Sequence, residues 1–123
     1  NGEEHESTIL AANNYAATLK DQSHFTEAKA LLRKSIPGAR RVHGESNILT
    51  LRLRWCYAMV LYHYDGASLD DLREAVTTLE GAVQIARRVL GGAHPVTMGI
   101  EGSLRNARAA LRARETPPTT SHT

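Results

Sequence analysis

The chain has 123 residues, of which 41% are hydrophobic and 23% charged, and its net charge is +2. This length fits one domain, and the composition excludes a largely disordered chain. The charge is too balanced to favour nucleic acid or an anionic membrane as a partner, and no run of about 18 apolar residues predicts a membrane span. Cys56 is the only cysteine, so no intrachain disulfide can form. This favours a reducing, intracellular compartment, cytoplasmic by default or an organelle reached after removal of a presequence.

A similar linker segment occurs three times, beginning at Gly2, Gly44 and Gly91. The steps between these segments are 42 and 47 residues, and other pairs such as Ala16 and Ala58 obey the same register. The five extra residues of the second period fall in the turn-like stretch 65–68 and its surroundings. Periods of this length indicate an array of helical repeats.

Apolar residues recur with helical spacing in five segments, two in each period and one after the last linker. They predict helices near residues 6–21, 24–42, 47–64, 69–90 and 95–114, with no sheet. Ser68 and Asp71 form a capping-box pattern, and Pro95 suits the first position of a helix. The sequence therefore predicts an all-α fold of antiparallel helix-turn-helix repeats in a short right-handed superhelix, an α-solenoid. Residues 1–115 form the array, two repeats and a capping helix, and residues 116–123 form an extended polar tail.

Two further expectations concern packing. Small residues would let neighbouring helices approach closely, while larger ones such as Tyr15 and Tyr57 fill the gaps. Pro37 and Gly38 should break or kink the second helix, because proline has no N–H and crowds the preceding turn. The small residues at the helix contacts are Ala16, Ala28, Ala58, Ala75 and Ala82.

The segments Asn13-Asn14-Tyr15-Ala16, 21–28 and Leu31-Leu32 resemble the core pattern of a tetratricopeptide repeat. The 42-residue period and the linker with the pattern Gly-x-x-His-Pro-x-Thr are similar to the longer, kinesin-light-chain type. The resemblance implies a protein that binds other proteins rather than an enzyme. Arg105 departs from the pattern, which has a small residue there, so the last helix is expected to be a solvated cap.

In tetratricopeptide arrays the concave face is built by the first helix of each repeat, and this places a peptide-binding groove on eight residues here. Asn amides can bind a peptide backbone, cationic side chains can pair with carboxylates, and an aromatic residue can supply an apolar anchor. The alternative is that Trp55 belongs to the core and that Asn13 is merely solvated. The implied groove residues are Asn13, Asn14, Ala17, Lys20, Arg52, Trp55, Met59 and Tyr62.

The sequence gives little support for a metal, catalytic or cofactor site. The six histidines lack the spacing of a zinc site, Cys56 suits a packed helical position, and no catalytic motif or cofactor site is predicted. Arg105, Arg108 and Arg112 form a basic stripe on one face of the last helix. No aromatic residues interleave with this stripe, so we expect no nucleic acid to bind there, and a solvated cap face is the other interpretation.

Two functions follow from the sequence. The first is an adaptor that binds a partner peptide, an acidic and aromatic or apolar segment, in the concave groove. The alternative is an architectural subunit held in a larger assembly, either a host complex or a homo-oligomer. An enzyme is not predicted.

Overall fold

The computed structural model describes residues 6–115, with the backbone only for residues 6 and 7. The predicted linker residues 1–5 and the predicted polar tail 116–123 lie outside this range. The described chain contains no strand, and each helix boundary lies within one residue of its predicted position. The all-α prediction is therefore confirmed. The helices are α1 (Glu6–Asp21), α2 (Phe25–His43), α3 (Ile48–His63), α4 (Leu69–Val89) and α5 (Pro95–Glu115).

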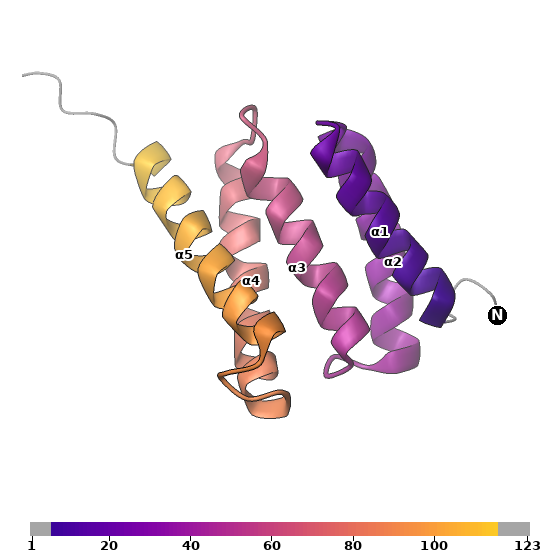
Figure 1. Ribbon diagram of the computed structural model, residues 1–123. Coiled ribbons are helices and arrows are strands. Elements are labelled where there is room, and N and C mark those ends of the chain that lie inside the picture. The colour runs from indigo at the N-terminus through magenta and orange to yellow at the C-terminus, as the bar shows by residue number, and fades with distance from the viewer. Residues whose placement is uncertain (1–5, 116–123) are drawn as a thin grey trace, which may run out of the picture.

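The helices form two layers, with α1, α3 and α5 in one and α2 and α4 in the other (Figure 1). Each helix packs on the next in the chain, and α3 also contacts α1 and α5 across the first layer. Consecutive helices are antiparallel, so the three helices of the first layer run in the same direction. This is the arrangement of a helical-repeat array.

Local sequence explains where three of the helices begin. Ser68 Oγ accepts a hydrogen bond from the Asp71 N–H (3.0 Å), and the Asp71 carboxylate accepts one from the Ser68 N–H (3.1 Å). This is the predicted capping box. Asn47 Oδ1 accepts from the Leu49 N–H at the start of α3. Pro95 is the first residue of α5, as predicted, and the preceding His94 ring accepts from the Val96 N–H at 3.1 Å.

The five extra residues of the second period lie in the turn before α4 and in the first turn of α4. Residues 64–68 connect α3 to α4, whereas only residues 22–24 connect α1 to α2, and α4 begins three residues before the equivalent of Phe25. The longer turn carries Tyr64, whose ring centroid lies 5.2 Å from that of Phe25 at the start of α2. The insertion therefore adds a contact between the two repeats without disturbing the register of the helices.

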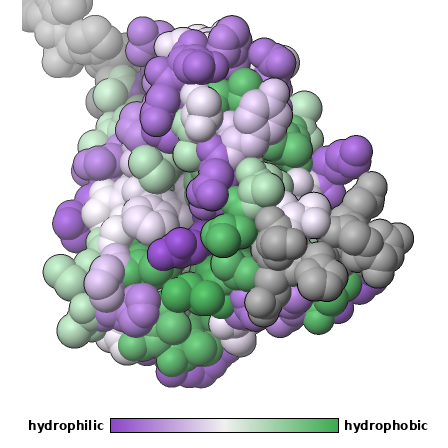
Figure 2. Space-filling view, turned by 45° about the vertical axis from the view of Figure 1, so that its right-hand side comes forward, coloured by the Kyte–Doolittle hydropathy of each residue, from purple (hydrophilic) through white to green (hydrophobic). Residues whose placement is uncertain are grey.

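Small residues form the contacts between helices, as predicted, since all five alanines named above are fully buried. Tyr57 is buried as well, but the prediction for Tyr15 is wrong because this side chain is 57% exposed. Tyr57 lies between α2 and α4, whereas α1 has no described helix on its corresponding side. The face shown in Figure 2 carries its hydrophobic side chains mainly in its lower half.

The predicted break at Pro37 does not occur, because α2 is continuous from Phe25 to His43, and a kink there stays a prediction. Pro37 faces solvent, whereas Ile36 and Ala39 on either side are buried in the core. The carbonyl of Arg33, which loses its helical donor, lies on the same exposed side and can bind water instead. Tertiary packing of the buried residues therefore outweighs the local preference of proline.

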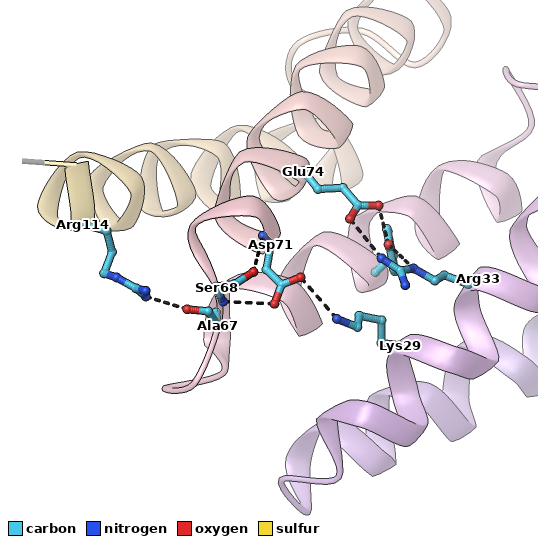
Figure 3. A network of polar contacts seen from close by, with 8 residues as sticks. Lys29, Arg33, Ala67, Ser68, Asp71, Glu74 and Arg114 are labelled. Atoms are coloured by element: carbon cyan, nitrogen blue, oxygen red, sulfur yellow. Dashed lines mark hydrogen bonds and ion pairs between the residues drawn. The ribbon is translucent and has the colours of Figure 1, made fainter.

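Polar contacts join α2, α3 and α4 on one side of the array (Figure 3). The Tyr57 hydroxyl accepts a hydrogen bond from Arg33 Nε (2.8 Å) and donates one to Glu74 Oε2 (2.5 Å). Burial, together with the hydrogen bond to Glu74, raises the pKa of Tyr57 to about 12. Lys29 donates to Asp71 at 3.2 Å. These contacts fix the relative positions of the two repeats.

Candidate functional site

A groove of about 390 Å³ lies between α1 and α3 on the surface of the array. The residues from each helix recur with spacings of three and four, which places them on one side of that helix. Six of the eight predicted groove residues are brought together here, with two that were not predicted. The lining residues are Asn13, Ala17, Lys20 and Asp21 from α1 and Arg52, Trp55, Cys56 and Met59 from α3.

Cationic groups lie toward opposite ends of this groove. Lys20 is in the last turn of α1, and Arg52 is near the start of α3. Lys20 forms an ion pair with Asp21 at 3.2 Å, whereas Arg52 is exposed and has no ion pair within residues 6–115. Asp21, the last residue of α1, is not among the predicted groove residues. A carboxylate of a ligand would find a free cation at Arg52 and a shared one at Lys20.

Asn13 lies between these cations and is half-buried. Its amide oxygen is shielded from solvent and accepts no hydrogen bond from the described residues. An unpaired buried acceptor is uncommon in folded proteins. A rotation of the Asn13 side chain would be needed to bring this oxygen into contact with a donor of a ligand.

Trp55 has two contacts that define its role. Its indole Nε1 donates to Ser103 Oγ at 2.9 Å, and the far edge of its ring lies over Gly99. The same side chain lines the groove and packs against the core. The groove position and the core position were alternatives in the sequence, but the indole is large enough to occupy both.

Cys56 forms part of the groove floor and is 8% exposed. Burial raises the pKa of its thiol to about 11, and Lys20 lowers it by a smaller amount. A thiol with such a pKa holds very little thiolate near neutral pH. Its contribution to the groove is therefore apolar surface.

Two of the predicted residues lie outside the groove lining. Asn14 is exposed, and its backbone carbonyl accepts a hydrogen bond from the Thr18 hydroxyl. Tyr62 packs beside His63 with ring centroids 4.5 Å apart. Burial lowers the pKa of His63, with Lys20 acting in the same direction. Tyr62 and His63 therefore flank the Lys20 end without lining the groove.

The predicted basic stripe lies on the exposed side of α5. Arg108 Nη2 donates to Glu80 of α4 at 2.9 Å, so this charge is paired. Arg105 and Arg112 are exposed and have no ion pair within the described part of the chain. The stripe is therefore only partly neutralised by the rest of the array.

The described helices were also compared with the requirements of a metal site and of a membrane span. Within residues 6–115, no three His, Cys, Asp or Glu side chains lie close enough to hold a metal ion. None of the five helices is both long and apolar enough to cross a bilayer.

A two-layer array of helical hairpins with a groove along its first helices defines a class of repeat scaffold, and comparison with known families agrees. A family model described as Tetratricopeptide repeat matches residues 8–48 and 67–96. The chain belongs to the tetratricopeptide-repeat family. No curated protein and no solved structure matches the chain in the corresponding searches.

Tetratricopeptide repeats generally mediate interactions between proteins and are non-enzymatic scaffolds. The part of α3 that carries Arg52, Trp55 and Met59 lies outside the two matched segments. The groove is thus formed partly by residues inside the matched segments and partly by residues outside them.

Proposed function

We propose that this protein is an adaptor that binds a short segment of a partner protein in the groove between α1 and α3. The observation that carries the proposal is the convergence of six predicted residues on one groove with apolar and cationic surfaces together. Trp55 and Met59 supply an apolar wall, and Lys20 and Arg52 supply positive charge at its ends. Pockets that combine an apolar surface with a few placed polar groups are typical binding sites.

The expected ligand is an extended or helical segment with an acidic residue beside a bulky apolar one. The apolar side chain would contact Trp55 and Met59, and the carboxylate would pair with Arg52, which has no ion pair of its own in the described chain. After rotation of its side chain, the Asn13 amide would hydrogen-bond the ligand. Each of these contacts uses a group that the array leaves unsatisfied or exposed.

A peptide array probed with the purified chain tests this proposal. Peptides with an acidic residue next to an aromatic or large aliphatic one should bind, and Trp55→Ala should weaken binding by about 2 kcal/mol. Arg52→Ala should weaken it less and mainly at low salt, because charges at a groove rim act through screened attraction. Lys34→Ala, on the exposed side of α2, is the control.

Trp55 also contacts α5, so Trp55→Ala affects stability as well as the groove. Binding affinity must therefore be compared per folded molecule. Met59→Ala gives a second readout, since Met59 lines the groove. If both variants bind every peptide as the wild type does, or if no peptide binds, the groove is not the binding site.

The second candidate is a subunit held permanently in a larger assembly or in a homo-oligomer. The observation that favours it is the outer side of α1, where Ala11, Tyr15 and Thr18 are exposed. The equivalent residues in α3, one period later, are Leu53, Tyr57 and Val60, and all are buried. Stoichiometric co-purification with a partner, abolished by Tyr15→Glu, would support this function. A monomer by light scattering with no such partner would exclude it.

The kinesin-light-chain type of repeat is part of the proposal. It is supported by the steps of 42 and 47 residues between linkers, against about 34 for the usual tetratricopeptide repeat. A better fit of both repeats to the 34-residue pattern would overturn it. The free thiol of Cys56 supports a reducing compartment inside the cell.

A further inference from the structure

The outer side of α5 corresponds to the side of α1 and of α3 against which the next helix packs. Each of α1 and α3 packs against the helix that follows it, α2 and α4, respectively. Three positions of α1 and the same three of α3 are buried, whereas their counterparts in α5 are exposed. The positions are Ile9, Ala16 and Leu19 in α1, Leu51, Ala58 and Leu61 in α3, and Met98, Arg105 and Arg108 in α5.

At these three positions α5 has one apolar residue, Met98, and two charged residues, Arg105 and Arg108. Met98 is 58% exposed, the largest exposed fraction among the large hydrophobic side chains of the described chain. Arg105 stands where the two earlier helices have a fully buried alanine. The guanidinium of Arg105 extends over Gly102 of the same helix, where an added Cβ would lie 3.7 Å from its Nη2.

The charges on this side are not balanced by the array. Arg108 is paired with Glu80 and Glu101 with Arg87, which leaves Arg105 and Arg112 without an ion pair in the described chain. These two residues lie seven positions apart, about 10.5 Å along the helix axis. They therefore present two unpaired positive charges two turns apart, beside an exposed methionine.

We propose that the outer side of α5, defined by Met98, Arg105 and Arg112, is a docking surface for an acidic amphipathic helix of a partner protein. The helix would lie on α5 as α2 lies on α1 and α4 on α3. Its apolar residues would cover Met98, and carboxylates two turns apart would pair with Arg105 and Arg112. This surface is separate from the groove between α1 and α3.

The side chains of α5 favour a protein over a nucleic acid. No aromatic residue of α5 offers a stacking surface for a base. Met98 gives an apolar contact that suits a side chain of a helix. A second copy docked through the same surface would bring arginines against arginines, which is unfavourable.

The test uses the full chain and two synthetic helical peptides of about 15 residues built from Ala and Leu. One peptide carries Glu at two positions seven residues apart, and its twin carries Lys there. The Glu peptide should bind with an affinity that falls as salt rises, and the Lys peptide should not. Arg105→Glu or Arg112→Glu should weaken binding of the Glu peptide by about tenfold, and Met98→Ala should weaken it by about threefold.

Matched variants separate this surface from general charge and from the groove. Lys34→Glu makes the same charge change on α2 and should not affect the Glu peptide. Because this peptide also has the acidic and apolar residues expected of a groove ligand, the α5 variants are tested again in the Arg52→Ala background, where their effects should persist. Equal binding of both peptides, or insensitivity to the α5 variants, would overturn the proposal. So would a single-stranded oligonucleotide that binds more tightly through the same arginines, or a dimer by light scattering that Met98→Ala dissociates.

Discussion

The indole of Trp55 in α3 is hydrogen-bonded to Ser103 in α5 at 2.9 Å, while the edge of the ring rests on the backbone of Gly99 one turn earlier. A Cβ added at Gly99 would lie 2.3 Å from two atoms of the ring, far inside van der Waals contact. Gly99 therefore makes room for the side chain that forms both the groove wall and the link to the last helix.

Gly99→Ala should consequently destabilise the protein, although alanine is favoured over glycine inside a helix by about 1 kcal/mol. The ring has to leave its position, so the hydrogen bond to Ser103 is lost or stretched. Trp55 is the only tryptophan, so its fluorescence reports the change directly, as a shift to longer wavelength. Gly102→Ala is the control, because its Cβ would meet only Arg105 Nη2 at 3.7 Å, and it should stabilise by about 1 kcal/mol. Two stabilising substitutions would show that the ring moves at little cost.

Tyr57→Phe should lower the free energy of unfolding by about 1 kcal/mol, because it removes both hydrogen bonds of the Tyr57 hydroxyl. The partners in these bonds are Arg33 and Glu74, on the helices before and after α3. Tyr15→Phe, at the equivalent and exposed position of α1, should change stability by less than about 0.5 kcal/mol. Urea unfolding of both variants measures the difference. Equal effects would mean that the hydroxyl of Tyr57 adds nothing to the contact between repeats.

Much of this fold could be predicted from the sequence, because helical periodicity, capping residues and the repeated linker are local signals. The five helices, the capping box of Ser68 and the position of Pro95 all follow from residues close in the chain. The predicted break at Pro37 is wrong because it also depends on a local signal alone. Its local preference opposes a helix, but burial of Ile36 and Ala39 in the array decides the outcome.

The groove could be predicted in part. The family pattern brought six of its residues together, since α1 and α3 repeat the same register. The double role of Trp55 could not be predicted, because it depends on Gly99 and Ser103, more than 40 positions away in the chain. The exposure of Tyr15 depends likewise on which helices lie beside α1, and no local pattern contains that information.

The capping box should make stability depend on pH in a defined direction. Burial acts to raise the pKa of Asp71, but hydrogen bonds from the Ser68 backbone and from Lys29 outweigh it, so the pKa lies below its ordinary value of 3.8. A carboxyl with a lowered pKa stabilises the fold above its unfolded pKa, and the contribution is lost as the pH falls through the folded pKa.

Asp71→Asn should therefore destabilise the protein at pH 7, and the difference from wild type should shrink as the pH is lowered toward about 3. Ser68→Ala should cost about 1 kcal/mol at neutral pH. Asp70→Asn is the control, because Asp70 is in the same helical turn but its side chain is 95% exposed. A difference between Asp71→Asn and wild type that is constant with pH would rule out the carboxylate as its source.

The Cys56 thiol should react slowly with Ellman's reagent in the folded protein. Its side chain is 8% exposed, and burial raises its pKa from 9.0 to about 11, which lowers the thiolate fraction near pH 8 about a hundredfold. Unfolding in urea should restore the rate of an ordinary thiol. A peptide bound in the groove should slow the folded reaction further, since Cys56 lines the groove. Rapid labelling of the folded protein would contradict the burial of Cys56 in the groove floor.

The last prediction concerns the tolerance of α2 for proline. Pro37 is one period before Gln84 in α4, both are exposed, and both helices are continuous. Pro37→Gln should stabilise the protein by up to about 3 kcal/mol, because glutamine restores the donor to the Arg33 carbonyl and removes the clash of the ring. The reciprocal change Gln84→Pro should destabilise it by a similar amount. Thermal unfolding of the two variants measures both effects against the same wild type. If Pro37→Gln gives no gain while Gln84→Pro is costly, then the packing of Ile36 and Ala39 requires the backbone geometry that proline imposes on α2, and the proline is a structural element of the first repeat rather than a tolerated defect.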